Sequence, residues 1–369
     1  MYSPLERFLI AATLQEPDQV PACPFATGHF ISWFAGIPEQ QAVEYWAGDY
    51  RKKLSSQLTV IKAFPEVQFW PGIWPDFGIA PEMTAFGCEV SFPKNASPAV
   101  RVPAIKSIED IDKLRVPDPK HDGLMPLYLE SYSHMIREIP KELRNNYGYC
   151  QWAITLGPTD IIGLSMGYDK FLVSLYRYPD AIHKAYKIVT KAIITWIEAQ
   201  REVIGSDLLT LIAGDADCFL NPKQFEIFVF PYLKEICTKL KKKGNIILYH
   251  NDGDTTHLLD KLKDIGANMF NYGQVGEESM DTALVKRKVG NKMCLVGGLN
   301  PIGVLLKGKP EEVDYACKKA ISEGGQNGGF ILSTGGAMAA HTPHENILAM
   351  INAARKYGKY PLSLDLVRD

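Results

Sequence analysis

The stretch NIILYHND, residues 245–252, decides the fold because it joins a strand pattern to polar side chains at the end of the strand. Its apolar run is nearly continuous, as expected of a parallel strand that helices cover on both faces. Further runs of the same character lie at 20–25, 67–74, 147–154, 207–214, 268–273, 293–298 and 329–334. Most of them are followed by Gly, Asp, Asn or Pro and then by a helical pattern, which indicates strands that alternate with helices.

Amphipathic helical patterns separate the later runs, and the clearest lie at 179–203, 221–243, 311–323 and 343–356. Strict alternation predicts a parallel sheet, and eight strand–helix units predict closure into a barrel. An open Rossmann-like sheet would need a Gly-x-Gly-x-x-Gly turn after an early strand, and the sequence has none. We therefore predict an α/β protein with one (β/α)8 TIM-barrel domain over residues 1–369. Segment 27–146 is longer than two units need, so we expect it to form insertions around the barrel mouth.

The composition is that of a folded globular protein, with 46% hydrophobic and 22% charged residues. A formal net charge of -2 gives the chain no general attraction to nucleic acid or anionic lipid. No stretch approaches the roughly 18 apolar residues of a membrane span, and the first residues lack a cleavable signal pattern. The 7 cysteines include no Cys-x-x-Cys pair, which indicates reduced thiols. We expect a cytoplasmic protein with no nucleic-acid or membrane partner.

Polar side chains follow the C-terminal ends of the predicted strands, where barrel enzymes place their reacting groups. In chain order they are His29, Asp76, Asp215, Asp217, His250, Asp252, Asn271, Asn300 and His341. Because so many apolar strands end in an acid, a histidine or an amide, solubility alone explains the pattern poorly. The sequence therefore predicts a site at this end of the barrel.

Each of these residues also has a structural interpretation. His250 and Asp252 have metal-ligand spacing, because residues i and i+2 of an extended segment point the same way. The alternative is a hydrogen-bonded histidine inside the barrel and an aspartate that starts a turn. Asp215 and Asp217 fit a ligand pair or an acid and a base, but one of them could instead cap the next helix.

Tryptophans gather near the first three strand ends, at Trp33, Trp70, Trp74 and Trp152. Some of these rings must belong to the core. Since the whole chain has 6 tryptophans, their concentration here favours a ligand pocket with aromatic walls.

Five segments resemble the uroporphyrinogen decarboxylase superfamily, which contains decarboxylases and cobalamin-linked methyltransferases on one barrel fold. The segments are PDFGIAPEMTAFGCEVSFP (75–93), LGPTDIIGLSMGYDKFL (156–172), NPKQFEIFVFPYLKEI (221–236), VGGLNP (296–301) and ILSTGGAMAAHTPHENILAMINAARKYGKY (331–360). The first of them resembles the decarboxylase segment that holds the catalytic aspartate, which would fall on Asp76. The decarboxylases also carry an Arg-Gln-Ala-Gly-Arg stretch after the first strand, whose arginines hold propionates. PACPFATGHFISWFAGI (21–37) has no Arg or Lys, so it lacks the bidentate partners of a polycarboxylate.

The methyltransferase branch is the closer resemblance. Its thiol-alkylating members bind zinc through a His-x-Cys after the fifth strand and a Cys after the eighth. This sequence keeps His250 but has Asp252 and Gly336 at the two cysteine positions. Zinc with thiolate ligands suits the activation of an acceptor thiol, so the loss of both sulfurs argues against that role and leaves the donor side of methyl transfer.

The resemblance thus implies a methyltransferase that moves a methyl group from a small donor, a methoxylated aromatic compound, to cobalt(I) of a partner corrinoid protein. His250, Asp252, Asp215 and Asp217 would form either a zinc site or a metal-free acid relay. Asp76 and His29 would orient the donor. The other substrate-binding residues would be Trp33, Trp70, Trp74, Trp152, Asn271, Asn300 and His341. Two alternatives stay open: a decarboxylase of uroporphyrinogen or a related carboxylic acid, and a non-catalytic barrel that binds a ligand or corrinoid. The sequence leaves the oligomeric state open, with a homodimer among the alternatives.

Overall fold

Six parallel strands form the central sheet, and they pair in chain order from β3 to β8. The computed structural model describes residues 2–241, 245–273, 275–276 and 280–363. The strands are β3 Trp152–Leu156, β4 Leu209–Ala213, β5 Ile246–Asn251, β6 Met269–Tyr272, β7 Cys294–Leu299 and β8 Phe330–Thr334. In the register of this sheet, His250 of β5 lies between Ala213 of β4 and Asn271 of β6. The predicted strands from 207–214 onward are thus found, with small shifts of their ends, whereas β3 overlaps the predicted strand 147–154 only at residues 152–154.

The two earliest predicted strands, 20–25 and 67–74, close the ring between β8 and β3 through isolated bridges. Ala22 bridges Leu332 of β8, and Phe25 bridges Trp70. The Cys150 N–H then donates to the Ile73 carbonyl at 3.0 Å. Prolines in both segments lack the N–H that a regular ladder needs, so these segments are not continuous strands. The prediction of a (β/α)8 barrel is confirmed.

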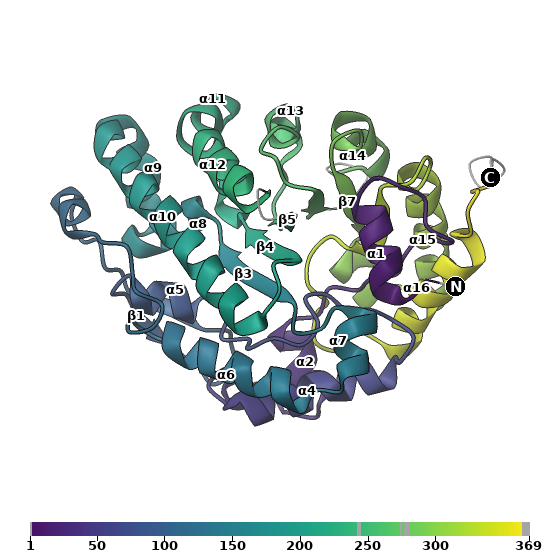
Figure 1. The fold of residues 1–369 in the computed structure, drawn as a ribbon. Coiled ribbons are helices and arrows are strands. Elements are labelled where there is room, and N and C mark those ends of the chain that lie inside the picture. Colours follow the sequence, from purple (N-terminus) through teal and green to yellow (C-terminus); the bar gives the residue numbers. More distant parts are fainter. Residues whose placement is uncertain (1, 242–244, 274, 277–279, 364–369) are drawn as a thin grey trace.

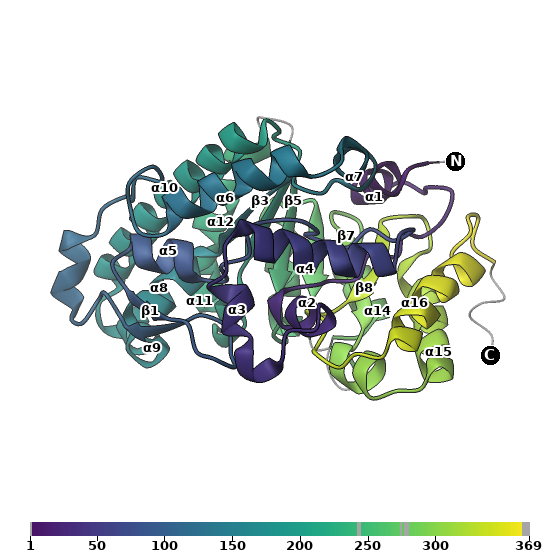
Figure 2. The same cartoon turned by 90° about the horizontal axis from the view of Figure 1, so that it is seen from below.

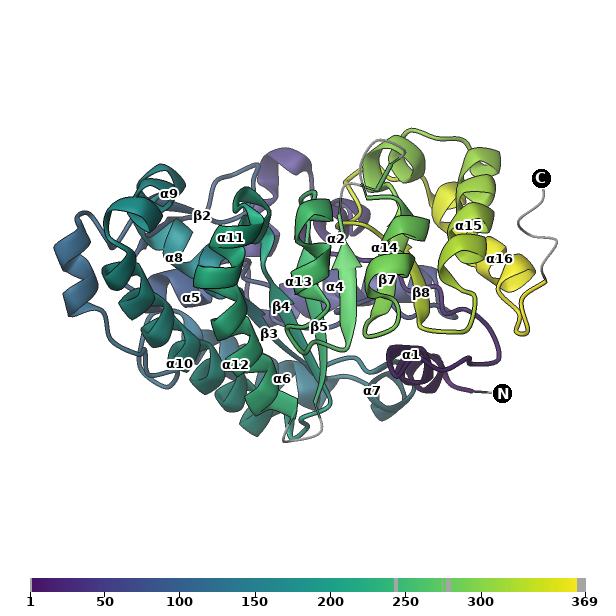
Figure 3. The same cartoon turned by 90° about the horizontal axis from the view of Figure 1, so that it is seen from above.

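Helices surround the strands as a ring, with α10 and α12 following the early strands and α15 and α16 the late ones (Figures 1 and 3). The helices of this part are α8 Pro158–Met166, α9 Tyr168–Arg177, α10 Pro179–Ile204, α11 Pro222–Gln224, α12 Phe230–Lys241, α13 Leu259–Leu262, α14 Thr282–Val289, α15 Pro310–Gly324 and α16 His344–Tyr357. Two 3₁₀ turns, η3 Asp215–Phe219 and η5 Thr256–Leu258, and two π turns, η4 Phe225–Val229 and η6 Pro301–Leu306, complete them. The predicted helix at 221–243 is therefore found as α11, η4 and α12, and its residues 242–243 lie outside the described residues.

The long segment 27–146 supplies two large helices, α4 and α6, which lie along one side of the ring (Figures 1 and 2). Its elements are α2 Gly28–Phe34, η1 Glu39–Gln41, α3 Val43–Trp46, α4 Tyr50–Ala63, α5 Ala80–Ala85, β1 Glu89–Ser91, β2 Ala99–Val102, η2 Ile108–Lys113, α6 Met125–Glu138 and α7 Lys141–Tyr147. Strands β1 and β2 form an antiparallel hairpin. Asn95 between them and His29 of α2 line a cleft together with Ala340, which follows β8. Part of the insertion thus lies on the mouth side of the barrel.

Helix α1, Pro4–Ala12, closes the opposite end of the barrel. Ser3 caps this helix by accepting the Glu6 N–H, and Pro4 occupies its first turn. Phe8 of α1 meets Trp152 edge to face at 6.0 Å, and both belong to one apolar cluster with inward-facing residues of the strands. The cysteines of the chain are all free thiols. Within the described residues, no helix has the length and apolarity to cross a membrane.

Candidate functional site

His250 stands at the C-terminal end of β5 with its side chain only 5% exposed. Its ring meets Phe25 edge to face at 5.2 Å and Trp70 at 6.3 Å. These two aromatic rings of the inner wall therefore restrict the orientation of the imidazole.

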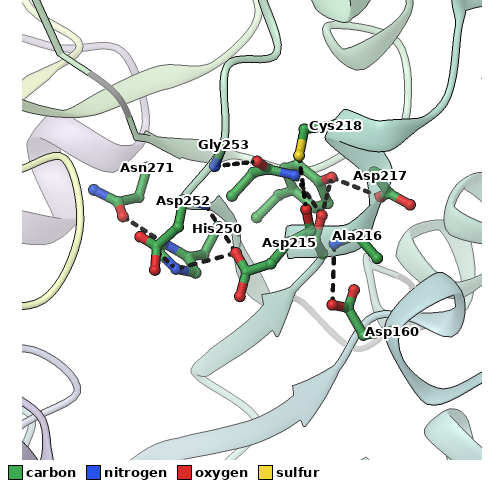
Figure 4. Close-up of polar contacts among 12 residues, drawn as sticks. Asp160, Asp215, Ala216, Asp217, Cys218, His250, Asp252, Gly253 and Asn271 are labelled. Atoms are coloured by element: carbon green, nitrogen blue, oxygen red, sulfur yellow. Dashed lines mark hydrogen bonds and ion pairs between the residues drawn. The ribbon is translucent and has the colours of Figure 1, made fainter. Parts of the chain in front are cut away.

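The two ring nitrogens of His250 have different surroundings. Nδ1 lies 2.6 Å from Oδ1 of Asn271, on the neighbouring strand β6. Nε2 faces the mouth, where Oδ1 of Asp252 lies at 3.3 Å and Oδ1 of Asp215 at 3.5 Å (Figure 4). The Asp252 N–H also donates to Oδ1 of Asp215 at 2.8 Å, which ties the loops after β4 and β5 together.

The buried imidazole of His250 lies between two acids whose side chains are about half exposed, at 45% for Asp215 and 55% for Asp252. Burial by itself lowers the pKa of His250, but the carboxylates of Asp252 and Asp215 outweigh it and raise the pKa to about 10. Partial removal from water acts to raise the pKa of Asp252, but the positive charge of His250 outweighs this effect and lowers the pKa. For Asp215, partial removal from water raises the pKa, the negative charge of Asp252 adds to this effect, and the positive charge of His250 opposes it.

The same three side chains have the donor set of a divalent cation site. One ligand atom from each of Asp215, His250 and Asp252 lies within 4.8 Å of the others. One imidazole nitrogen and two carboxylate oxygens fit zinc or a harder divalent metal. Asp215 thus adds a third ligand to the predicted pair of His250 and Asp252. Gly336 contributes no side chain to this group, and a Cβ atom placed there would lie 2.9 Å from Oδ1 of Asp252.

The loop that carries Asp215 is held by buried partners, of which Asp160 was not predicted. Asp160 in the first turn of α8 accepts the Ala216 N–H at 3.0 Å. The Tyr249 hydroxyl and the Asn251 amide both donate to the Gly214 carbonyl. In the sequence Asp160 looks like an ordinary acid at a helix N-terminus, so only its tertiary contact reveals that it positions Asp215.

Asp217 is separated from the site, although we predicted it as a catalytic partner of Asp215. Both lie in the 3₁₀ turn η3, which has about 3 residues per turn, so side chains two positions apart point to different sides (Figure 4). Asp217 is fully buried and accepts from the Tyr249 hydroxyl at 2.7 Å. Burial raises its pKa to about 7. This arrangement makes Asp217 a support for the loop.

Asp76 is likewise enclosed, at 1% exposure, instead of facing the mouth. Its carboxylate accepts from the Tyr45 hydroxyl at 3.3 Å and the Gly78 N–H at 3.2 Å. Burial raises its pKa to about 6, and the nearby positive charge of Lys53 opposes this. Lys53 is itself buried and donates to the Tyr45 and Trp46 carbonyls. Among the described residues Asp76 has no contact with His250, so its position fits a buried counter-charge for Lys53 better than a reacting group.

Three of the four predicted aromatic wall residues belong to the core. Trp70 and Trp152 are 0% and 1% exposed, and Trp74 is 8% exposed. Trp70 stacks on Phe25 at 3.8 Å, and its indole N–H donates to Oγ of Ser333 at 2.9 Å. Inward-facing positions of a small barrel are filled by side chains, so Trp70 and Trp152 pack inside the barrel, whereas Trp74 packs in the larger apolar core. All three rings leave little surface for a ligand.

The remaining predicted residues lie at the rim. Trp33 lies 5.0 Å from the His341 ring, and Nε2 of His341 contacts Glu39 at 3.0 Å. His29 is exposed and lines the cleft with Glu39, and burial on one side lowers its pKa. Asn300 caps η6 by accepting the Ile302 and Gly303 N–H groups and donates to the Val275 carbonyl. Its polar atoms are thus committed to the loop after β7.

Known proteins of two activities resemble this chain over most of its length. A methylcobamide:CoM methyltransferase MtbA of Methanosarcina acetivorans is 24% identical over 358 residues, covering 96% of this chain and 98% of that protein. A uroporphyrinogen decarboxylase of Anaeromyxobacter sp. Fw109-5 is 25% identical over 286 residues, covering 74% of this chain and 77% of that protein.

A solved methyltransferase from Methanosarcina mazei superposes with a TM-score of 0.80 at 19% identity, covering 97% of this chain and 99% of the other. This similarity bears on the fold alone. The family profile of uroporphyrinogen decarboxylase matches residues 4–357. The chain therefore belongs to the uroporphyrinogen decarboxylase (URO-D) family.

Proposed function

We propose that the protein is a corrinoid-dependent methyltransferase that takes a methyl group from a methoxylated aromatic compound and passes it to cobalt(I) of a partner corrinoid protein. The observation that carries this proposal is the cluster of Asp215, His250 and Asp252 at the barrel mouth. Its nitrogen and oxygen donors suit an oxygen leaving group, whereas the related thiol-alkylating enzymes are expected to use thiolate ligands. The MtbA relative supports methyl transfer as the reaction class.

In the proposed reaction the bond between the methyl carbon and the ether oxygen breaks, and its electron pair stays on oxygen. Cobalt(I) supplies the pair for the new carbon–cobalt bond and becomes methylcobalt(III), while the oxygen takes up one proton to give a phenol. Nε2 of His250 can deliver that proton, because the two carboxylates keep the imidazolium at the mouth. Its pKa of about 10 is close to that of a phenol, about 10, so the proton transfer is nearly balanced.

A divalent metal held by Asp215, His250 and Asp252 would supply Lewis-acid stabilisation of the same oxygen. In either form the chain must hold the ether oxygen near Nε2 and keep both carboxylates aimed at it. The residues after β4, β5 and β8 that surround this point are therefore the expected binding surface for the donor.

Decarboxylation is less well supported, although decarboxylases are among the relatives. Segment 21–37 contains no cationic residue, so the expected clamp for propionates is missing. Asp76, at the position of the catalytic aspartate, is buried with Tyr45 and Lys53.

The test is incubation with a corrinoid protein in the cobalt(I) state and a panel of methoxylated aromatics, methylated amines and thioethers. Conversion to methylcobalt(III), followed by absorbance, is expected with a methoxylated aromatic. His250→Gln should slow it by about 10²- to 10⁴-fold, as for loss of a general acid. His121→Gln is the matched control, because His121 contacts Asp118 on the surface and is 78% exposed. If no donor in the panel gives the spectral change, the proposal is wrong.

Metal content is measured on the same samples, with Asp215→Asn and Asp252→Asn beside the wild type. A metal site predicts clearly reduced occupancy in both variants. Equal metal content in all three proteins would rule out these carboxylates as required ligands and leave the proton-donor form of the site.

A further inference from the structure

The side chain of Asn271, whose orientation is fixed by its own hydrogen bonds, contacts His250 on the side away from the barrel mouth. Oδ1 of Asn271 lies 2.6 Å from Nδ1 of His250. The Asn271 amide nitrogen donates to the Val296 carbonyl at 2.7 Å and to the Thr334 carbonyl at 3.0 Å. The amide of Asn271 on β6 thus contacts three other strands, β5, β7 and β8.

These contacts fix which end of the amide faces the histidine. A rotated amide would set its oxygen against two carbonyl oxygens, and Asn271 is fully buried, so no bulk water could relieve that repulsion. Oδ1 therefore faces Nδ1 of His250, and an amide oxygen can only accept a hydrogen bond. Nδ1 of His250 must carry the hydrogen.

A neutral imidazole has one protonated and one bare nitrogen. With the hydrogen held on Nδ1, the bare nitrogen is Nε2, which points to the mouth between Asp215 and Asp252. Both protons on the amide nitrogen and the oxygen of Asn271 are used in the contacts described. Asn271 was predicted as a substrate-binding residue, but this arrangement leaves it no polar group for a substrate.

We propose that Asn271 is a positioning residue that keeps the hydrogen on Nδ1 of His250, so that Nε2 alone binds a metal or exchanges a proton with the donor. The use made of Nε2 rests on the proposed function, whereas the state of Nδ1 does not. Outer partners of this kind typically change metal affinity by about 10- to 100-fold when they are removed.

Three variants separate positioning from simple loss of stability. Asn271→Leu removes the acceptor for Nδ1 and both amide donors. Asn271→Asp also removes those donors but keeps an oxygen acceptor for Nδ1. Asn346→Leu is the matched control, because Asn346 is a buried asparagine that donates to the Leu305 and Gly308 carbonyls without touching His250.

Two measurements are made on each protein: the ¹⁵N NMR spectrum of the histidine side chains, assigned with His250→Gln, and zinc affinity by chelator competition. In the wild type, Asn346→Leu and Asn271→Asp we expect an Nδ1–H signal of His250 that is protected from exchange with water. In Asn271→Leu this proton has no acceptor, so we expect the signal to be lost through exchange. Zinc affinity should fall about 10- to 100-fold in Asn271→Leu, and less in Asn271→Asp.

A bare Nδ1 in the wild type would overturn the proposal, as would an unchanged Nδ1–H signal in Asn271→Leu. If the signal behaves as expected but no variant or wild type binds zinc, the positioning role stands and the metal-bound form of the proposed site fails. If zinc affinity falls equally in Asn271→Leu and Asn346→Leu, the effect is general destabilisation and the positioning role is wrong.

Discussion

Oδ1 of Asp252 lies 2.9 Å from the point where a Cβ atom on Gly336 would stand. The carboxylate therefore occupies the space that a side chain after β8 would need. In the resemblance described above, these two positions carry the two zinc-binding cysteines. The structure gives a reason for the paired change, since Asp252 in this orientation requires glycine at 336. Gly336 also has a φ of 151°, which favours glycine.

Gly336→Ala should displace Asp252 from Nε2 of His250 because the new methyl group and the carboxylate oxygen cannot both fit. We expect metal affinity to fall by about 10-fold or more, together with about 1–3 kcal/mol of backbone strain. Gly167→Ala is the control, since Gly167 also has a positive φ, 87°, but nothing lies within 4 Å of its Cβ position. Chelator competition and urea unfolding distinguish the two effects. Equal metal affinity in the two variants would show that Asp252 does not depend on the space at Gly336.

Metal affinity should depend on pH through His250. Its pKa is raised to about 10 by Asp252 and Asp215 against the effect of burial, so a proton competes with the metal for Nε2 throughout the neutral range. Apparent affinity should rise about 10-fold per pH unit from pH 6 to 9. In the metal-free protein, a raised histidine pKa stabilises the fold below the unfolded value of about 6.5, and this stability is lost as pH rises through about 10.

Chelator competition at pH 6, 7 and 8 tests this dependence. The double variant Asp215→Asn/Asp252→Asn removes both charges that raise the pKa of His250, so its remaining affinity should level off at a lower pH. A pH-independent affinity in the wild type would exclude Nε2 of His250 as a ligand.

Asp76→Asn should destabilise the protein without altering the site at His250. The variant removes the negative charge of Asp76, which favours the charged form of the buried Lys53, and we expect the free energy of unfolding to fall by about 1–3 kcal/mol. Lys53→Met in the same chain should recover much of this loss, as measured by urea unfolding. Zinc affinity is the second measurement. If Asp76→Asn lowers zinc affinity strongly while stability is unchanged, Asp76 acts in the site at His250 and the prediction is wrong.

Glu82 should make stability fall as pH rises. Its carboxyl group is buried and accepts the Leu156 N–H at 3.2 Å, and burial raises its pKa from 4.5 to about 7. The folded protein therefore binds this proton more tightly than the unfolded chain, so stability declines between pH 4.5 and about 7 and is level above. The change corresponds to about 3 kcal/mol.

The free energy of unfolding of Glu82→Gln, relative to that of the wild type, should therefore rise by about 3 kcal/mol from pH 5 to pH 8. Urea unfolding at both pH values measures this difference. Glu202→Gln is the control, because the Glu202 side chain is 70% exposed. The same pH dependence in wild type and Glu82→Gln would assign the decline to other groups.

The sequence by itself determined the barrel and the end at which its site lies. Apolar runs such as 245–250 and the helical patterns between them are local, because strand and helix periodicity depends on residues a few positions apart. The spacing of His250 and Asp252 was local in the same sense, and the structure brings both to one point.

Only the tertiary structure decided which candidates serve that point, because their roles depend on contacts between distant segments. The 3₁₀ turn after β4 sends Asp215 to His250 and Asp217 into the core. Asn271 is fixed by carbonyls of β7 and β8, at 25 and 63 residues' separation. No local pattern encodes such pairings, since they arise from the register of closed parallel strands.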